Sequence, residues 1–262
     1  MPKLRSAVNR IWPRGALVAG ILLLWSAIYA AGIFDPALFP SPLAVWEALT
    51  SNMFGPEGLF VAAIKSVERL AIGMAISIVI GTVIGLAMAW WKAVQRSLGT
   101  LMVALQALPS IAWLSLALLW FGDRSARAIV YVVILGAFPS VAIATATSVR
   151  LVPPVLVRAA QTLGAEGWEL QRSVVFPAAI PGYFVGLQQA WAFAWRALLA
   201  GELIASGAHG LGQTIHAAGA QEDVALVLAA MVVIVIIGLL VDLGLTVFDK
   251  RIRSSRGLLV SD

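Results

Sequence analysis

The chain has 262 residues, of which 61% are hydrophobic and 12% are charged, and its formal net charge is +5. Soluble domains carry about 25% charged residues. Together with a mean hydropathy of +0.94, this composition excludes an ordinary water-soluble protein. The absence of cysteine excludes a disulfide framework, a thiolate zinc site and a cysteine nucleophile.

Six long runs without Asp, Glu, Lys or Arg follow one another along the chain. They contain 18 to 26 residues, and a helix of that length, rising about 1.5 Å per residue, crosses a hydrocarbon core of about 30 Å. The sequence therefore predicts an all-α membrane protein with six transmembrane helices. The first run is long for a signal peptide and lacks a clear small-residue cleavage site, so we interpret it as a retained span. The runs are 16–34, 70–91, 97–122, 128–149, 173–195 and 224–241.

The basic residues indicate how these spans are oriented. Thirteen of the eighteen Lys and Arg residues fall in segments that share one side of a six-span chain. The positive-inside rule places that side, with both termini, in the cytoplasm. There, 1–15 has the spacing of an interfacial helix, with a frayed basic tail as the alternative, and 250–262 is a basic tail. We expect the lipid bilayer, and no nucleic acid, as a partner.

Small residues and a proline mark the second and third runs. Gly81 and Gly85 form a small-xxx-small pair, which favours close helix contact. Lys65, Glu68 and Arg69 precede the second run and could pair as i,i+3 or i,i+4 neighbours, but we favour a solvated helix end. Pro109 removes a backbone hydrogen bond inside the third run and predicts a bent helix. That bend could form a gate or a cavity wall, or it could be a packing kink.

The polar segment 149–176 separates the fourth and fifth runs. Pro153 and Pro154 suit the first turn of a helix over 155–163. Gly164 fits a left-handed cap that ends this helix, and a second helix is predicted over 165–175. Connections of this length are usually functional or disordered, and a surface helix with small residues can lie in a groove of another protein. A purely structural loop is the alternative. The first helix is expected to expose Ala159, Ala160, Thr162 and Leu163.

The spacing within this segment resembles the EAA loop of binding-protein-dependent ABC importer permeases. The family pattern is E-A-A, three residues, Gly, nine residues, then I-x-L-P. This chain has R-A-A beginning at Arg158, Gly164 at the expected distance, and V-x-F-P ending at Pro177. Arg158 reverses the charge of the family glutamate but leaves the spacing intact. The motifs FPSP, WFG, GLQQAWAFAW, AGEL and GLG resemble the subgroup that imports aliphatic sulfonates, taurine and nitrate.

This resemblance implies a type I ABC importer permease fold in the bacterial inner membrane, with 16–249 as the six-span permease domain. It implies a homodimer of permeases, two cytoplasmic ATPase subunits that use ATP and Mg²⁺, and an external solute-binding protein. The loop helix would be the coupling helix. The chain has no Walker motif, so we expect neither enzymatic activity nor a cofactor of its own. The residues expected to couple to the ATPase are Arg158, Ala159, Ala160, Thr162, Leu163, Gly164, Ala165 and Pro177.

Charged and polar residues within the spans are candidates for the substrate pathway, because charges there are costly and often functional. Arg196 could attract an anion, or it could pair with an acid on another span, such as Glu202 of the second chain or Asp242. A structural or gating role is expected for Glu202. Three further side chains share one face of the fifth span and could line a cavity or form a helix contact. The candidates are Pro109, Gln188, Trp191, Trp195, Arg196 and Glu202.

Other classes of function fit the sequence less well. His209 and His216 are the only histidines, and two helical turns would put them about 10 Å apart, too far for a shared metal. An intramembrane enzyme would need a catalytic arrangement that two histidines do not supply. The alternative is a self-sufficient secondary transporter, which predicts inverted repeats, and we find no convincing internal repeat. The resemblance leaves the transported solute open.

Overall fold

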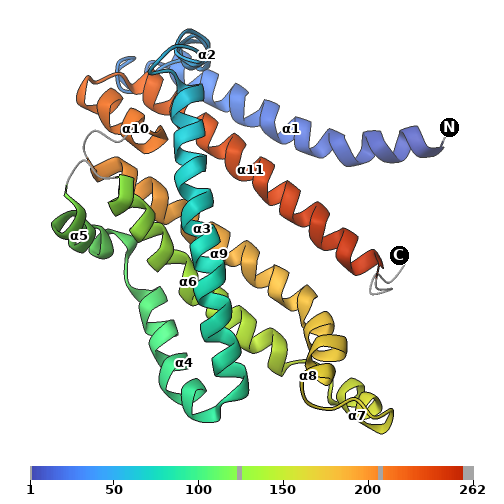
Figure 1. Cartoon of the computed structure of the whole chain (residues 1–262). Coiled ribbons are helices and arrows are strands. Elements are labelled where there is room, and N and C mark those ends of the chain that lie inside the picture. Colours follow the sequence, from blue (N-terminus) through green and yellow to red (C-terminus); the bar gives the residue numbers. More distant parts are fainter. Residues whose placement is uncertain (1, 123–125, 206–208, 256–262) are drawn as a thin grey trace.

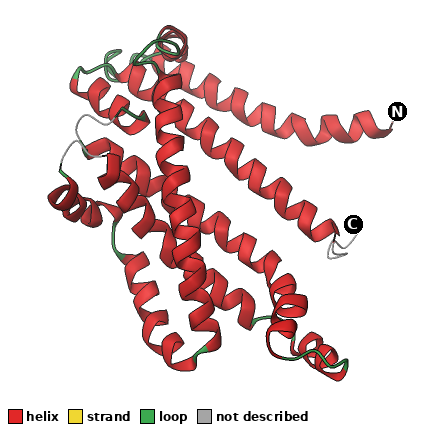
Figure 2. Cartoon of the chain, viewed as in Figure 1, coloured by secondary structure: helices red, strands yellow, loops and turns green. Residues whose placement is uncertain are grey.

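The computed structural model describes residues 2–122, 126–205 and 209–255, and these segments contain helices and loops without strands (Figures 1 and 2). The all-α prediction is therefore confirmed for the described residues. The helices are α1 Pro2–Ala30, α2 Pro42–Ser51, α3 Leu59–Trp90, α4 Lys92–Ala107, α5 Ser110–Phe121, α6 Ala126–Arg150, α7 Pro154–Thr162, α8 Gly167–Leu170, α9 Phe176–Ile204, α10 Leu211–Ala220 and α11 Val224–Ser255.

Three long helices, α3, α6 and α9, form the centre of the molecule (Figure 1). Small residues let α3 and α6 approach closely. A Cβ atom added at Gly81 would lie 2.7 Å from the carbonyl oxygen of Phe138, and one added at Gly85 would lie 2.5 Å from that of Ala142. These distances leave no room for a side chain, and they confirm the helix contact predicted for the glycine pair.

Helices lie along all six predicted runs. Among the described residues, α3, α6 and the part of α11 over Val224–Arg251 are long and apolar enough to cross a membrane by themselves. α4 and α5 are long and apolar enough for one span only when they are taken together, and the angle between them is 92°. The apolar part of α1 is the shorter stretch Gly15–Ala30. α9 has 29 residues but is not among the helices that meet this criterion of length and hydropathy. The span count of six consequently stays a prediction.

The third run is a broken pair of helices, and the prediction of one bent helix is wrong in this respect. α4 ends at Ala107, and Leu108 and Pro109 have extended backbone with ψ angles of 129° and 137°. A residue before proline is pushed out of the helical region by the proline ring. Because two consecutive residues leave that region, α5 restarts in a new direction.

Both terminal segments are continuous with their neighbouring spans. α1 runs unbroken from Pro2 to Ala30, so no break in the helix marks residue 15, and the interfacial segment 1–15 stays a prediction. α1 lies beside α2 and apart from the central helices (Figure 1), and the indole N–H of Trp25 donates to the carbonyl oxygen of Pro40 at 3.0 Å. The basic tail predicted from residue 250 begins inside α11, and residues 256–262 lie outside the described part of the chain.

Candidate functional site

The segment between α6 and α9 contains the predicted first helix. α7 begins at Pro154, after Pro153 with a ψ angle of 125°. It ends where Gly164 has a φ angle of +91°, a conformation that glycine adopts without a Cβ penalty. The N–H of Ala165 then donates to the carbonyl oxygen of Ala160 at 3.0 Å, which satisfies one of the last carbonyls of the helix. The predicted cap at Gly164 is confirmed.

The second predicted helix, 165–175, has different bounds and no separate end. α8 spans only Gly167–Leu170 and begins at a second left-handed glycine, Gly167, with φ +53°. A single π-helical stretch, Gln171–Val175, then leads directly into α9. The N–H of Phe176 donates to the carbonyl oxygen of Gln171, five residues back. Pro177 follows this wider turn and lies in the first turn of α9. A proline is tolerated in the first turn of a helix, because its missing N–H would have no partner within the helix there.

The coupling residues divide into an outward and an inward group. Ala160 and Ala165 are half-buried against a cluster formed by Val152, Leu170 and neighbouring residues. The expectation that Ala160 is exposed with its neighbours is therefore wrong, because it packs on the inner side of the turn. Pro177 is also half-buried. The outward group, exposed to solvent, is Arg158, Ala159, Thr162, Leu163 and Gly164.

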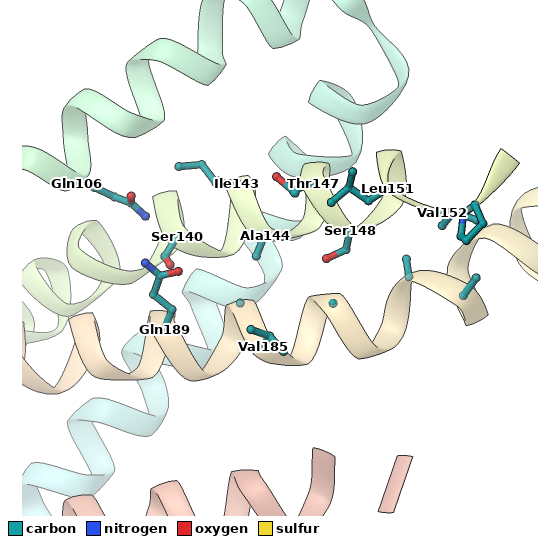
Figure 3. A pocket seen from close by; sticks show the side chains of 15 residues that line it. Gln106, Ser140, Ile143, Ala144, Thr147, Ser148, Leu151, Val152, Val185 and Gln189 are labelled. Atoms are coloured by element: carbon teal, nitrogen blue, oxygen red, sulfur yellow. The ribbon is translucent and has the colours of Figure 1, made fainter. Parts of the chain in front are cut away.

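A cleft of about 490 Å³ lies between α4, α6 and α9 (Figure 3). Two side-chain amides, Gln106 of α4 and Gln189 of α9, gather with the hydroxyl of Ser140 at one end of it. Thr147 and Ser148 continue the polar lining along α6. The opposite end reaches Val152 and Pro153, which lead into α7. One cleft thus extends from the middle of α9 to the start of the loop helix.

None of the six residues predicted for the pathway lines this cleft. Pro109 is exposed between α4 and α5, and Gln106, one turn earlier, lines the cleft instead. Gln188 is half-buried, whereas its neighbour Gln189 lines the cleft. Trp191 and Trp195 stack on each other with ring centroids 5.6 Å apart and pack against the core, which matches the helix-contact alternative.

Arg196 lies on the same face of α9 as the cleft. It is seven residues after Gln189, or two turns and about 10 Å along the helix. Its side chain is exposed, its Nε donates to the carbonyl oxygen of Ala192 at 3.0 Å, and its guanidinium lies 5.0 Å from the ring centroid of Phe193. Within the described ranges it forms no ion pair with Glu202, Asp242 or another acid.

Glu202 is fully buried and lies in a network that joins three helices. It accepts hydrogen bonds from the hydroxyl of Ser66 at 2.7 Å, from a guanidinium nitrogen of Arg69 at 2.6 Å and from the N–H of Gly212 at 3.1 Å. Ser66 in turn accepts from the N–H of Leu211 at 2.9 Å. The Arg69 side chain is only 11% exposed, so the solvated position predicted for Arg69 is wrong, whereas the Lys65 and Glu68 side chains are about half exposed as predicted. This geometry holds the start of α10 against α3 and α9.

The described residues hold no cluster of three or more His, Cys, Asp or Glu side chains that could bind a metal ion. His209 is exposed at the start of the α10 segment, and His216 lies within α10. Neither histidine faces the cleft.

Residues 47–254 match the family model of the binding-protein-dependent transport system inner membrane component. The chain belongs to this family. The permease is similar to the taurine transport system permease protein TauC of Escherichia coli, with 30% identity over 92% of this chain and 88% of that protein. It is also similar to the bicarbonate transport system permease protein CmpB of Synechococcus elongatus, with 29% identity over 92% of this chain and 89% of that protein.

A solved structure of the MetNI methionine ABC transporter in an inward-facing conformation shares the fold, with a TM-score of 0.65 and 19% identity. The match covers 74% of this chain and 96% of that one. The permease is a multi-pass inner membrane protein without catalytic function, and ATP hydrolysis belongs to a separate subunit. Its partners in such a system are that ATPase and a solute-binding protein.

Proposed function

We propose that two copies of this permease form the pathway through which an ATP-driven importer moves a small anion into the cytoplasm. The observation that carries the proposal is the continuity of α9. One end of this helix is joined through α8 to the exposed helix α7, and its middle lines the cleft. A movement of α7 therefore changes the wall of the cleft. In this arrangement six spans cross the membrane, and α7 and both termini face the cytoplasm.

The lining of the cleft suits a polar solute that must be released again. Hydroxyls and amides from Gln106, Ser140, Thr147 and Gln189 can donate and accept hydrogen bonds, and none of the described residues that line the cleft is charged. Neutral groups bind an anion more weakly than ionised ones do. A volume of about 490 Å³ is within the range of small-molecule sites, which fits a compact solute.

Arg196 supports an anionic solute. It continues the cleft-lining face of α9 toward the end that carries α10, and it has no acidic partner among the described residues. A guanidinium is well suited to planar or tetrahedral oxyanions such as a sulfonate, nitrate or bicarbonate. The relatives named for taurine and bicarbonate carry solutes with such groups. Taurine, a sulfonate, nitrate and bicarbonate are accordingly the solutes to test first.

The exposed face of α7 is proposed as the ATPase contact. Leu163 is 89% exposed, and Arg158, Ala159 and Thr162 of the same short helix segment are exposed as well. A leucine that is exposed among small residues can enter an apolar groove of a partner, and Arg158 favours an acidic residue beside that groove. A self-sufficient secondary transporter is not retained as an alternative, because the family works with a separate ATPase.

The test of this function is the ATPase activity of the complete complex in lipid nanodiscs. The complex contains the permease, its ATPase and its solute-binding protein, and the binding protein is loaded in turn with taurine, an alkylsulfonate, nitrate or bicarbonate. We expect one loaded form to stimulate hydrolysis above the level with the empty binding protein. Equal hydrolysis with every loaded form and with a cationic solute would contradict the assignment of an anion.

A further inference from the structure

A second hollow, of about 680 Å³, lies between the first part of α4 and the second half of α6. Arg96 and Thr100 line it from α4. Thr147 and Arg150 line it from α6, and Arg150 is the last residue of that helix. The turn between α3 and α4 lies at the same end of the bundle as α7 (Figure 1). The hollow therefore lies at the end of the permease that is proposed to face the cytoplasm.

This arginine-lined hollow adjoins the cleft between α4, α6 and α9. Ile143 and Thr147 line both of them. Arg150 follows Thr147 by three residues, which is about one helical turn. The polar face of α6 that borders the cleft thus leads directly to an arginine at the cytoplasmic end of the helix.

The hollow carries positive charge that no acid balances. Within the described ranges, neither Arg96 nor Arg150 forms an ion pair or a side-chain hydrogen bond, and both are exposed. None of the described residues that line the hollow is acidic. The positive-inside rule accounts for basic residues on the cytoplasmic side, but it does not require that two helices bring them to one hollow beside the cleft. Two guanidinium groups without a carboxylate suit an oxyanion, which accepts hydrogen bonds from them.

We propose that this hollow is the cytoplasmic site that the transported oxyanion, such as a sulfonate or nitrate, occupies before its release. The inference rests on the proposed function, because it takes the solute to be an anion. A membrane potential that is negative inside opposes the inward movement of an anion. The charges of Arg96 and Arg150 offset this opposition at the exit. The pathway is then positive at Arg196, neutral in the cleft and positive again at its cytoplasmic end.

Thiol labelling of the complete importer in phosphatidylcholine nanodiscs tests the site. Thr100→Cys, one turn after Arg96, places a reporter in the hollow of a permease that has no native cysteine. The two probes are methanethiosulfonate reagents that carry either a sulfonate or a trimethylammonium group. A cleft lined by one sign of charge raises the local concentration of opposite charges by about 10- to 1,000-fold. We therefore expect the ratio of anionic to cationic labelling rates to fall about tenfold or more in the variant Arg96→Gln, Arg150→Gln.

Two matched variants and a competitor complete the experiment. Arg96→Lys, Arg150→Lys keeps both charges and should keep the ratio. Lys92→Gln, Arg172→Gln removes two cations that do not line the hollow and should change the ratio little. Millimolar ethanesulfonate should slow anionic labelling more than sodium chloride of equal ionic strength does. This protection should be lost when Arg96 and Arg150 are replaced by Gln.

Three results would overturn the proposal. The first is a labelling ratio that falls equally in both Gln double variants, or in neither, because the charge would then not belong to the hollow. The second is the absence of protection by ethanesulfonate. The third is protection by phosphatidylglycerol in the nanodisc that ethanesulfonate does not replace, which would assign the arginines to a lipid headgroup.

The labelling experiment and the test of the proposed function can fail separately. Labelling needs neither ATP nor the solute-binding protein. It can therefore give a negative result while a loaded anion still stimulates ATP hydrolysis, which would remove the exit site alone. A positive labelling result without stimulation by any loaded anion would instead contradict the proposed function.

Discussion

Arg69 of α3 and Glu202 of α9 lie 133 positions apart in the sequence and form an ion pair of 2.6 Å inside the bundle. The same carboxylate receives the N–H of Gly212, so the pair also fixes where α10 begins. Burial of a charge is tolerated when it is paired and hydrogen-bonded. The pair therefore joins the second and fifth predicted spans to the α10 segment, at the end of the bundle opposite α7.

Removal of Arg69 is expected to destabilise the permease strongly. Arg69→Met leaves the buried Glu202 carboxylate without its counter-charge, which costs about 3–5 kcal/mol. Thermal unfolding of the purified complex, followed by fluorescence-detected gel filtration, measures the loss. The double variant Arg69→Met, Glu202→Gln should recover part of it, because no unpaired charge remains. Lys65→Met is the control, since its half-exposed pair with Glu68 contributes about 0–1 kcal/mol. Equal effects of the two single variants would contradict the assigned role of the buried pair.

A methyl group at Gly85 is expected to separate α3 from α6. The added Cβ of Gly85→Ala would meet the carbonyl oxygen of Ala142 at 2.5 Å, and overpacking of this kind costs about 1–3 kcal/mol. Gly244→Ala in α11 is the matched control, because no heavy atom lies within 4 Å of its added Cβ. The melting temperature should fall for the first variant and stay level or rise for the second. A fall of the same size in both would show that helix propensity, not the close contact, decides the result.

Gly164→Val is expected to uncouple ATP hydrolysis from transport. The added side chain meets no neighbouring atom, but the φ angle of +91° strains any residue with a Cβ. The end of α7 would shift, while the cleft between α4, α6 and α9 stays intact. Gly164→Asn should retain more coupling, since asparagine tolerates a left-handed backbone better. The measurement is solute transported per ATP hydrolysed in proteoliposomes, and an unchanged ratio with valine would contradict the role of this turn.

Arg196→Gln is expected to reduce transport of an anion without loss of assembly. A hydrogen bond to a charged group contributes about 1.5–3 kcal/mol, so transport kcat/KM should fall by about 10- to 100-fold. Arg196→Lys keeps the charge, so its transport kcat/KM should lie between those of the wild type and the Gln variant. Gel filtration of the complex provides the check on assembly. If the Gln variant falls apart, Arg196 has a structural role and the substrate contact is wrong.

Local signals in the sequence were sufficient for the all-α class and for the first helix of the loop. The uncharged runs located the long helices, because apolar length alone decides whether a helix can span lipid. Pro154 and Gly164 fixed both ends of α7, since each acts through its own backbone conformation. These features depend on a residue and its immediate neighbours, so they can be predicted without the tertiary structure.

Features that depend on distant contacts could not be predicted in the same way. Arg69 appeared to end a solvated helix because its partner, Glu202, is 133 residues away. Gln188, Trp191 and Trp195 were predicted to share one face of the helix, in a cavity wall or in a helix contact, and it is the neighbour Gln189 that lines the cleft. One residue corresponds to about 100° of helix rotation, and that rotation depends on packing against distant helices, such as the contact of Trp191 and Trp195 with the core.

Site-directed cross-linking tests most directly whether the exposed face of α7 contacts the ATPase. A single cysteine at Leu163, which is 89% exposed, carries a thiol-reactive benzophenone, and a matched cysteine at Leu119 of α5, which is 82% exposed, is the control. The chain has no native cysteine. We predict an adduct between permease and ATPase from position 163 and none from position 119. An ATPase adduct from position 119 alone would contradict the account.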